Sequence, residues 1–210
     1  MNIINKISSF QDKRIPWILM IILSASLVIL AHSFFQNYLY MMPCEQCVYI
    51  RFAFLCMTLG GLIAIINPKN LILAGIGYIF AFWGVIQGII YSLKLAKIHK
   101  VIHSDNPFGV QGCQSDPSYP FGLKLDKLAP SWFAPTGDCG YDNPIVPNGV
   151  SLDSIQSYFI HLYKDGWYLI PSKQFMSMAD CTLLGFGVCF FILLSMLGCK
   201  IITLFKNYKF

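Results

Sequence analysis

Four long stretches almost free of charged residues constrain the fold of this 210-residue chain more than any other feature. We place four helices, of 20 or 21 residues each, at 16–36, 46–66, 71–91 and 181–200. At a rise of about 1.5 Å per residue, each of them crosses a hydrocarbon core of roughly 30 Å. Backbone polar groups in lipid must be bonded within their own segment, which a helix achieves. The sequence therefore predicts an all-α membrane protein, a bundle of four transmembrane helices in one membrane domain over 1–210.

The composition agrees with this assignment. Hydrophobic residues make up 56% of the chain and charged residues 12%, whereas a soluble domain carries about 25% charged residues. A cleaved signal peptide is the alternative for the first stretch. That stretch is longer than a signal-peptide core, and AHSFFQ (31–36) is a poor cleavage site, so we expect a retained helix.

The positive charges are distributed unevenly between the two sides of the predicted helices. The N-terminal segment, the NPKN turn (67–70) and the C-terminal tail together carry seven Lys or Arg residues and one Asp. The long segment 92–180 carries seven Lys and eight Asp residues. The lysine-rich side of a membrane protein is the cytoplasmic one. We therefore expect both termini in the cytoplasm, and we attribute the net charge of +5 to this topology and not to nucleic-acid binding.

The eight cysteines fall into two groups by position. Cys44 and Cys47 lie at the outer end of the second helix, and Cys113 and Cys139 lie in the long outer segment, where disulfides persist. The other four lie within or at the ends of predicted helices, where a thiol usually packs as a small hydrophobic group. They are Cys56, Cys181, Cys189 and Cys199.

The C-x-x-C spacing of Cys44 and Cys47 favours redox chemistry over a structural role. A Cys113–Cys139 disulfide would stabilise the fold by about 3–4 kcal/mol through loop closure. A C-x-x-C disulfide constrains too little chain to stabilise much, but its two sulfurs exchange electrons readily. A four-thiolate zinc site is the alternative. Structural zinc sites usually use two close pairs, and here the second pair is 26 residues apart, so we expect no metal.

Arg51 adds a positive charge one helical turn after Cys47. The start of a helix favours a negative charge, and a cation on the same face adds to this effect, so we expect both to stabilise a thiolate at Cys47. Snorkelling of the arginine to the interface is the alternative interpretation. At the edge of the hydrocarbon core, the natural electron acceptor for such a thiolate is a lipid-soluble quinone. The chain has no G-x-G-x-x-G dinucleotide fingerprint.

These motifs together resemble a known family. FFQNYLYMMPCEQCVYIR (34–51), four spans and an outer cysteine pair 26 residues apart are similar to the DsbB family of disulfide-generating quinone reductases. PTGDCGYDNP (135–144) is similar to its DsbI branch, and the resemblance extends from about Pro16 to Lys206. The specific signal is C-x-x-C-x-x-x-R at the start of the second of four helices. Ile50 departs from the polar or acidic residue that many relatives carry there.

The resemblance implies an electron relay at the outer face of the bacterial inner membrane. A periplasmic thioredoxin-fold oxidase, similar to DsbA or DsbL, would attack the Cys113–Cys139 disulfide and form a mixed disulfide with Cys113. The released Cys139 would exchange with Cys44, and Cys47 would pass electrons to ubiquinone or menaquinone.

The resemblance also implies which residues contact the quinone. Arg51 matches the quinone-interacting arginine of the family. Gln36 and Pro43 match residues that flank the quinone pocket.

The long outer segment 92–180 carries further expectations. It should continue the third helix briefly, break at DNPFG (105–109) and remain irregular through 107–147, where Pro and Gly recur. SLDSIQSYFIHLYKDG (151–166) has apolar residues at helical spacing, and predicts a membrane-surface helix of about fourteen residues that Ser151 caps and Gly166 ends. His99 and His103 have the spacing of metal ligands on a helix. We expect them to be solvated at the interface or close to the quinone headgroup, because no third ligand is nearby.

Two other classes of protein share some of these features. A tetraspanin-like scaffold has four spans and a disulfide-stapled outer loop, but it has no use for Cys44, Cys47 and Arg51, and its Cys-Cys-Gly run is absent. A relative of the vitamin K epoxide reductases has C-x-x-C beside quinone, but typically on a late helix. A quinone-dependent thiol oxidoreductase explains all of these residues.

Overall fold

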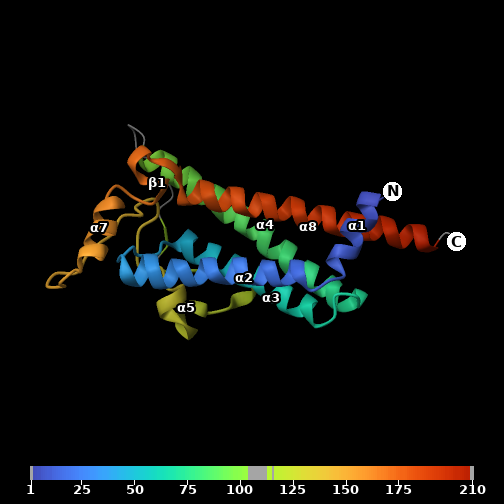
Figure 1. Ribbon diagram of the computed structural model, residues 1–210. Coiled ribbons are helices and arrows are strands. Elements are labelled where there is room, and N and C mark those ends of the chain that lie inside the picture. The colour runs from blue at the N-terminus through green and yellow to red at the C-terminus, as the bar shows by residue number, and fades with distance from the viewer. Residues whose placement is uncertain (1, 104–112, 115, 209–210) are drawn as a thin grey trace. The chain divides into compact units, whose positions relative to one another are not determined.

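The computed structural model describes residues 2–103, 113–114 and 116–208. Its long helices are α2 (Ile15–Leu30), α3 (Glu45–Ile66), α4 (Leu71–Ile102) and α8 (Met178–Tyr208), and a short helix α1 (Asn2–Gln11) precedes them (Figure 1). A π-helical segment, η1 (Ala31–Tyr38), continues α2 without a break. Four helices of the described chain are long and apolar enough to cross a membrane. The predicted all-α membrane class is therefore confirmed.

The segment between α4 and α8 holds several short elements. They are η2 (Pro120–Gly122), α5 (Leu125–Leu128), α6 (Pro130–Phe133), α7 (Ser154–Leu162), β1 (Tyr168–Ile170), η3 (Pro171–Lys173) and β2 (Phe175–Ser177). The described part of 107–147 is largely irregular, as expected, but it contains three short helices, η2, α5 and α6. Pro120 and Pro130 each start a short helix, because a proline at the first position loses no helical hydrogen bond. The predicted break at 105–109 lies outside the described residues.

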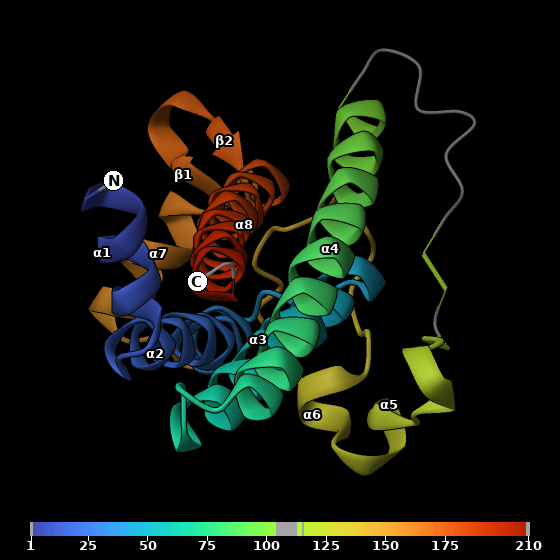
Figure 2. The same cartoon turned by 90° about the vertical axis from the view of Figure 1, so that its right-hand side faces the viewer.

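The surface helix α7 is shorter than predicted, and a hairpin follows it. Asp153, and not Ser151, caps α7 by accepting a hydrogen bond from the backbone N–H of Gln156 at 2.5 Å. The helix has nine residues and ends at Leu162, before Gly166. Strands β1 and β2 pair in antiparallel fashion, with Tyr168 opposite Ser177, and lead directly into α8 (Figure 2). The sequence analysis missed this hairpin because each strand has only three residues.

The described chain divides into two compact units, and the first comprises 1–27, 53–87 and 185–210. Helix α3 contacts all three of its long neighbours in this unit. The Ser24 and Thr58 hydroxyls lie 2.8 Å apart, and the rings of Phe54 and Phe186 stack at 4.3 Å. A side chain on Gly60 would lie 2.6 Å from the carbonyl oxygen of Gly77, so α3 and α4 pack backbone against backbone there.

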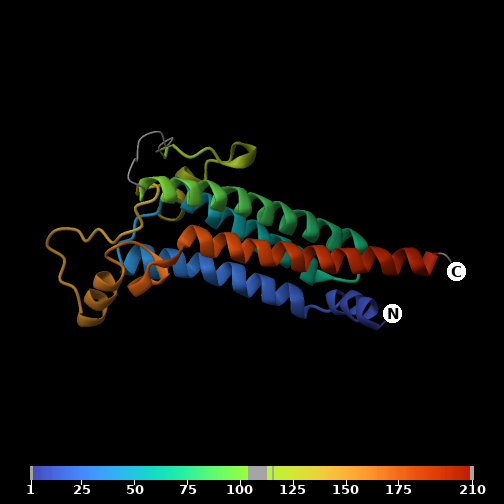
Figure 3. The same cartoon turned by 90° about the horizontal axis from the view of Figure 1, so that it is seen from above.

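The three lysine-rich segments meet at one end of this first unit. Gln11, Asp12, Pro68, Lys69 and Lys200 line one pocket, and Lys200 pairs with the carboxylate of Asp12. Both chain ends lie at this end of the unit (Figure 3).

The second unit comprises 28–52 and 88–184 and contains both outer cysteine pairs. Its core joins α3 to the long outer segment through aromatic side chains. The ring of Tyr119 lies 5.3 Å from that of Tyr49 and 5.6 Å from that of Phe52, and its hydroxyl donates to the carbonyl oxygen of Phe133 at 2.7 Å. Ser92 of α4 donates a hydrogen bond to Thr182 of α8 at 2.9 Å.

The close packing of α3 on α4 predicts that Gly77→Ala destabilises the protein. The new methyl group would lie 2.7 Å from the Ala64 side chain and 2.8 Å from the carbonyl oxygen of Gly60, so backbone must shift. We expect a loss of about 1–3 kcal/mol, as for other overpacked cores, and a lower melting temperature in detergent. Gly75→Ala is the matched control on the same helix, since nothing lies within 4 Å of its new methyl group. Equal melting temperatures for the two variants would contradict this packing.

Candidate functional site

The first cysteine pair lies at the N-terminus of α3. Cys44 immediately precedes the helix, and its sulfur accepts a hydrogen bond from the backbone N–H of Cys47 at 3.2 Å. The helix starts at Glu45, one residue before the predicted start at 46, so Cys47 lies in its first turn. The backbone N–H of Cys47 therefore binds the Cys44 sulfur, and it favours a negative charge on this sulfur when the disulfide opens.

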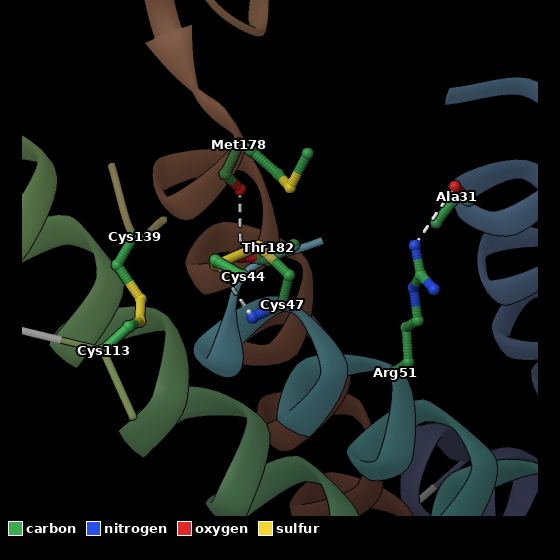
Figure 4. The surroundings of a disulfide bond; sticks show 8 residues. All are labelled: Ala31, Cys44, Cys47, Arg51, Cys113, Cys139, Met178 and Thr182. Carbon is green, nitrogen blue, oxygen red and sulfur yellow. Dashed lines mark hydrogen bonds between the residues drawn. A yellow bond between two sulfur atoms is a disulfide. The ribbon is translucent and has the colours of Figure 1, made fainter. Parts of the chain in front are cut away.

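Both predicted cysteine pairs lie at disulfide distance. The Cα atoms of Cys44 and Cys47 are 5.0 Å apart, and those of Cys113 and Cys139 are 5.7 Å apart, within the usual range of about 4.4–6.8 Å. Figure 4 shows both disulfides, the first at the start of α3 and the second beside α4. Cys44 and Cys139 are buried, with 1% and 5% of their surface exposed, whereas Cys113 is half-buried. Cys113 is thus the more accessible member of the outer pair.

Backbone hydrogen bonds attach the Cys139 segment to the residue just before Cys44. The N–H groups of Thr136 and Gly137 both donate to the carbonyl oxygen of Pro43, at 2.9 and 3.0 Å. A side chain at position 137 would lie 2.5 Å from the carbonyl oxygen of Met42, which explains the glycine there. Cys139 is two residues beyond this contact, so the structure brings its segment to the start of α3.

Gly140 lets the same segment approach α4. Its φ of +85° is a conformation that favours glycine. A Cβ at this position would lie 2.5 Å from the end of the Ile102 side chain and 3.6 Å from Cα of His99. The sequence DCGYD therefore turns tightly against the C-terminal end of α4.

Side chains of α3 hold the Cys113 segment in a similar way. The backbone N–H of Gln114 donates to Oε2 of Glu45 at 3.0 Å, and that of Ser118 donates to the Tyr49 hydroxyl at 2.7 Å. Tyr49 in turn donates to Oε1 of Glu45 at 3.2 Å. Sequence analysis missed both residues, although Glu45 is a charged residue within the C-x-x-C motif.

Arg51 is a buried cation whose described partners are neutral oxygens. Its guanidinium donates to Oε1 of Gln36 at 2.7 Å and to the carbonyl of Trp132 at 3.0 Å. It also donates to the carbonyl of Ala31 at 3.3 Å, the contact that Figure 4 shows. Only 6% of its surface is exposed. Within the described part of the chain, no carboxylate lies within 4.0 Å of it. The alternative of simple snorkelling does not fit a guanidinium that is enclosed in this way.

His32 and Trp132 complete the surroundings of Arg51, and sequence analysis missed them. The two rings stack with centroids 3.8 Å apart. Nδ1 of His32 lies 3.4 Å from Oε1 of Gln36, and its Nε2 lies 3.2 Å from Nδ2 of Asn37. Because the amide nitrogen of Asn37 can only donate, a neutral ring with its proton on Nδ1 satisfies all of these contacts.

These residues fit a quinone headgroup chemically. A buried cation whose described partners are neutral oxygens attracts a polarised carbonyl oxygen, and the C-x-x-C pair lies one helical turn before Arg51. Ile29 and Leu30, next to Ala31, expose 54% and 47% of their surface, which suits contact with lipid. Pro43, expected to flank this pocket, also binds the Cys139 segment through its carbonyl oxygen.

The remaining predicted residues are four cysteines and two histidines. Four cysteines are free, and their positions range from buried to half-buried: Cys56, Cys181, Cys189 and Cys199. The rings of His99 and His103 stack at 4.2 Å, and Nδ1 of His103 lies 2.9 Å from the carbonyl oxygen of His99. Among the described residues, no group of three or more His, Cys, Asp or Glu could hold a metal ion.

Asp142, three residues after Cys139, has an altered acidity. Burial raises its pKa to about 6, and the charge of the nearby His103 opposes this shift. The folded state therefore favours the protonated carboxyl more than the unfolded chain does. This contribution to stability is complete below the ordinary pKa of 3.8 and is lost as the pH rises through about 6.

We expect Asp142→Asn to remove this pH dependence. Relative to wild type, the variant should melt at a higher temperature at about pH 7.5, and the difference should disappear at about pH 4. Melting in detergent at both pH values measures it, with Asp165→Asn, an exposed carboxylate of the same loop, as the control. A difference between variant and wild type that does not depend on pH would contradict the prediction.

Comparisons with known proteins agree with this geometry. The family model described as "Disulfide bond formation protein DsbB" matches residues 13–196. The chain is 57% identical to a putative protein-disulfide oxidoreductase DsbI of Campylobacter fetus, over 96% of this chain and 94% of that protein. It is 56% identical to the protein-disulfide oxidoreductase DsbI of Salmonella typhimurium, over 90% of this chain and 86% of that protein. It is 55% identical to the DsbI protein of an Escherichia coli strain, over 90% of this chain and 87% of that protein. Together, the match along most of the chain and the two cysteine pairs, one at the start of α3 and one in the long outer segment, establish that this protein belongs to the DsbB family.

Proposed function

We propose that this protein is a dithiol:quinone oxidoreductase that reoxidises a periplasmic thioredoxin-fold oxidase similar to DsbA or DsbL. The observation that carries the proposal is the attachment of both loop cysteine segments to residues 43–49, around the C-x-x-C pair. Such an arrangement suits the transfer of electrons from Cys113 and Cys139 to Cys44 and Cys47. Family membership supports the same chemistry, and the scaffold alternative has no support.

The relay begins with an attack on the outer disulfide. A thiolate of the reduced partner attacks Cys113, forms a mixed disulfide with it and releases Cys139 as a thiolate. The half exposure of Cys113 and the burial of Cys139 support this direction of attack. The second thiol of the partner then breaks the mixed disulfide, so that the partner leaves oxidised and Cys113 becomes a thiolate.

The released Cys139 passes the electron pair inward. Its thiolate attacks Cys44, forms a Cys44–Cys139 disulfide and releases Cys47 as a thiolate. Cys113 then attacks Cys139, which restores the outer disulfide and leaves Cys44 and Cys47 reduced. The N–H of Cys47 is placed to stabilise the charge on Cys44.

Arg51, Gln36 and the Cys47 sulfur are the residues that would hold the quinone. A bound ubiquinone or menaquinone supplies a two-electron acceptor, which takes the electrons and protons released as Cys44 and Cys47 close their disulfide. Arg51 donates hydrogen bonds to a carbonyl oxygen, and Gln36 orients the guanidinium through its Oε1 contact. Pro43 acts on the loop side, by fixing the Cys139 segment.

We propose that the chain forms one multi-pass domain of the bacterial inner membrane, with cytoplasmic termini and periplasmic cysteines. The convergence of Lys69, Lys200 and the N-terminal segment at one end of the first unit supports this orientation. Exposed apolar residues of α7, Ile155 and Tyr158, support its place at the membrane surface.

The relay predicts that Cys44→Ser, Cys47→Ser, Cys113→Ser and Cys139→Ser each abolish turnover. The assay follows the reduction of a short-chain quinone by the purified protein in the presence of a reduced thioredoxin-fold partner. Cys56→Ser, Cys189→Ser and Cys199→Ser should remain active, because these thiols lie outside the relay. Normal turnover by the Cys44 or Cys47 variant would rule out the relay.

Arg51→His should mainly raise the apparent KM for quinone. Loss of a charged hydrogen bond of about 1.5–3 kcal/mol corresponds to about a tenfold to hundredfold increase. Turnover at saturating quinone should change less. Arg14→His, a change at an exposed residue outside the second unit, serves as the control. An unchanged KM in Arg51→His would exclude this arginine from quinone binding.

A further inference from the structure

Glu45 occupies an unusual position, directly between the two cysteines of the C-x-x-C motif. Only 8% of its surface is exposed, so its carboxylate is largely removed from water. A buried carboxylate is costly unless hydrogen bonds compensate it. Its two oxygens accept from the Gln114 backbone N–H at 3.0 Å and from the Tyr49 hydroxyl at 3.2 Å. Gln114 is the residue that follows Cys113.

Tyr49 extends this contact by one helical turn. Its hydroxyl accepts a hydrogen bond from the backbone N–H of Ser118 at 2.7 Å while it donates to Glu45. Its ring is buried and lies 4.9 Å from the ring of Tyr91 and 5.3 Å from that of Tyr119. Residues four apart on α3 thus bind N–H groups four apart in the loop. We call Glu45 and Tyr49 the amide clamp.

The amide clamp complements the contact at Pro43. The Pro43 carbonyl binds the chain shortly before Cys139, and the clamp binds the chain just after Cys113. Both attachments use backbone N–H groups of the loop. Holding a cysteine near its exchange partner raises its effective concentration, and hence the rate of exchange.

The charge of Glu45 has a second consequence. A carboxylate next to a cysteine disfavours the thiolate, because two like charges repel each other. Glu45 flanks Cys44 directly and lies two residues before Cys47. It therefore disfavours the reduced pair and favours onward loss of electrons. Tyr49 carries no charge and has no such effect.

We propose that Glu45 and Tyr49 are positioning residues that hold the Cys113 segment against the C-x-x-C pair during disulfide exchange, and that the Glu45 carboxylate also shifts that pair toward the disulfide. This inference rests on the proposed relay and adds to it a clamp that neither the C-x-x-C motif nor Arg51 supplies.

The test uses the full chain in detergent and compares Glu45→Gln, Glu45→Asp and Tyr49→Phe with wild type. The first measurement is the rate at which reduced Cys44 and Cys47 appear after addition of dithiothreitol as electron donor, which depends on the attack of Cys113 on the Cys44–Cys139 disulfide, with alkylation and mass spectrometry of the quenched protein. We expect all three variants to be about threefold to tenfold slower, as for the loss of one or two hydrogen bonds. The KM for quinone should not change. Tyr158→Phe, at an exposed tyrosine of α7, is the control for Tyr49→Phe.

The second measurement is the ratio of reduced to oxidised Cys44–Cys47 at a fixed dithiothreitol poise. Glu45→Gln removes the charge and should make the pair more reduced, whereas Tyr49→Phe and Glu45→Asp keep the charge and should leave the ratio close to wild type. A merely structural role would not separate the variants in this way. Wild-type rates in Glu45→Gln and Tyr49→Phe would overturn the clamp and leave the relay intact. Absence of cysteine-dependent turnover in wild type would overturn both.

Discussion

Hydrogen bonds from loop N–H groups to residues just before and at the start of α3 are the constraint on which the rest of this site depends. In its described part, the segment between α4 and α8 has only short helices and one small hairpin, so we expect hydrogen bonds as well as packing to position its two cysteines. Three carbonyl or side-chain acceptors receive these hydrogen bonds: Tyr40 binds the N–H of Ile145, Pro43 binds the Cys139 segment, and Glu45 binds the Cys113 segment. All three acceptors lie within six residues, around Cys44. Every residue except proline has a backbone N–H group. This attachment therefore tolerates changes of the loop side chains, other than changes to proline.

Two buried residues of opposite charge, Glu45 and Arg51, have different roles at the start of α3. Glu45 lies on the loop side, where its carboxylate binds N–H groups and opposes thiolate formation. Arg51 lies on the side of Ala31 and Gln36, where its described partners are neutral oxygens. Its charge therefore remains available to a carbonyl oxygen that arrives from lipid. Electrons would thus move away from the negative residue and toward the positive one, which is the favourable direction.

The sequence predicted the features that depend on composition and spacing. Long uncharged stretches require helices, so α2, α3, α4 and α8 were predictable. The spacing of Cys44 and Cys47 and their distance from Arg51 identified the redox motif. Contacts between distant segments could not be predicted in this way. The sequence indicated no role for Glu45, because its partner Gln114 is 69 residues away. The sequence predicted Ser151 as the N-cap of α7, whereas Asp153 caps the helix in the structure. The Tyr38 hydroxyl also donates a hydrogen bond to the Asp153 carboxylate, and these two residues are 115 apart in the sequence.

The most direct test of this account is the disulfide that forms when the relay is stopped midway. In the Cys47→Ala, Cys113→Ala double variant, only Cys44 and Cys139 remain of the four site cysteines. Peptide mapping of the non-reduced protein by mass spectrometry identifies their partners. The account predicts a Cys44–Cys139 disulfide in most molecules, because the Pro43 contact holds the Cys139 segment beside Cys44. Free thiols at both positions, or a disulfide between Cys139 and another cysteine, would contradict it.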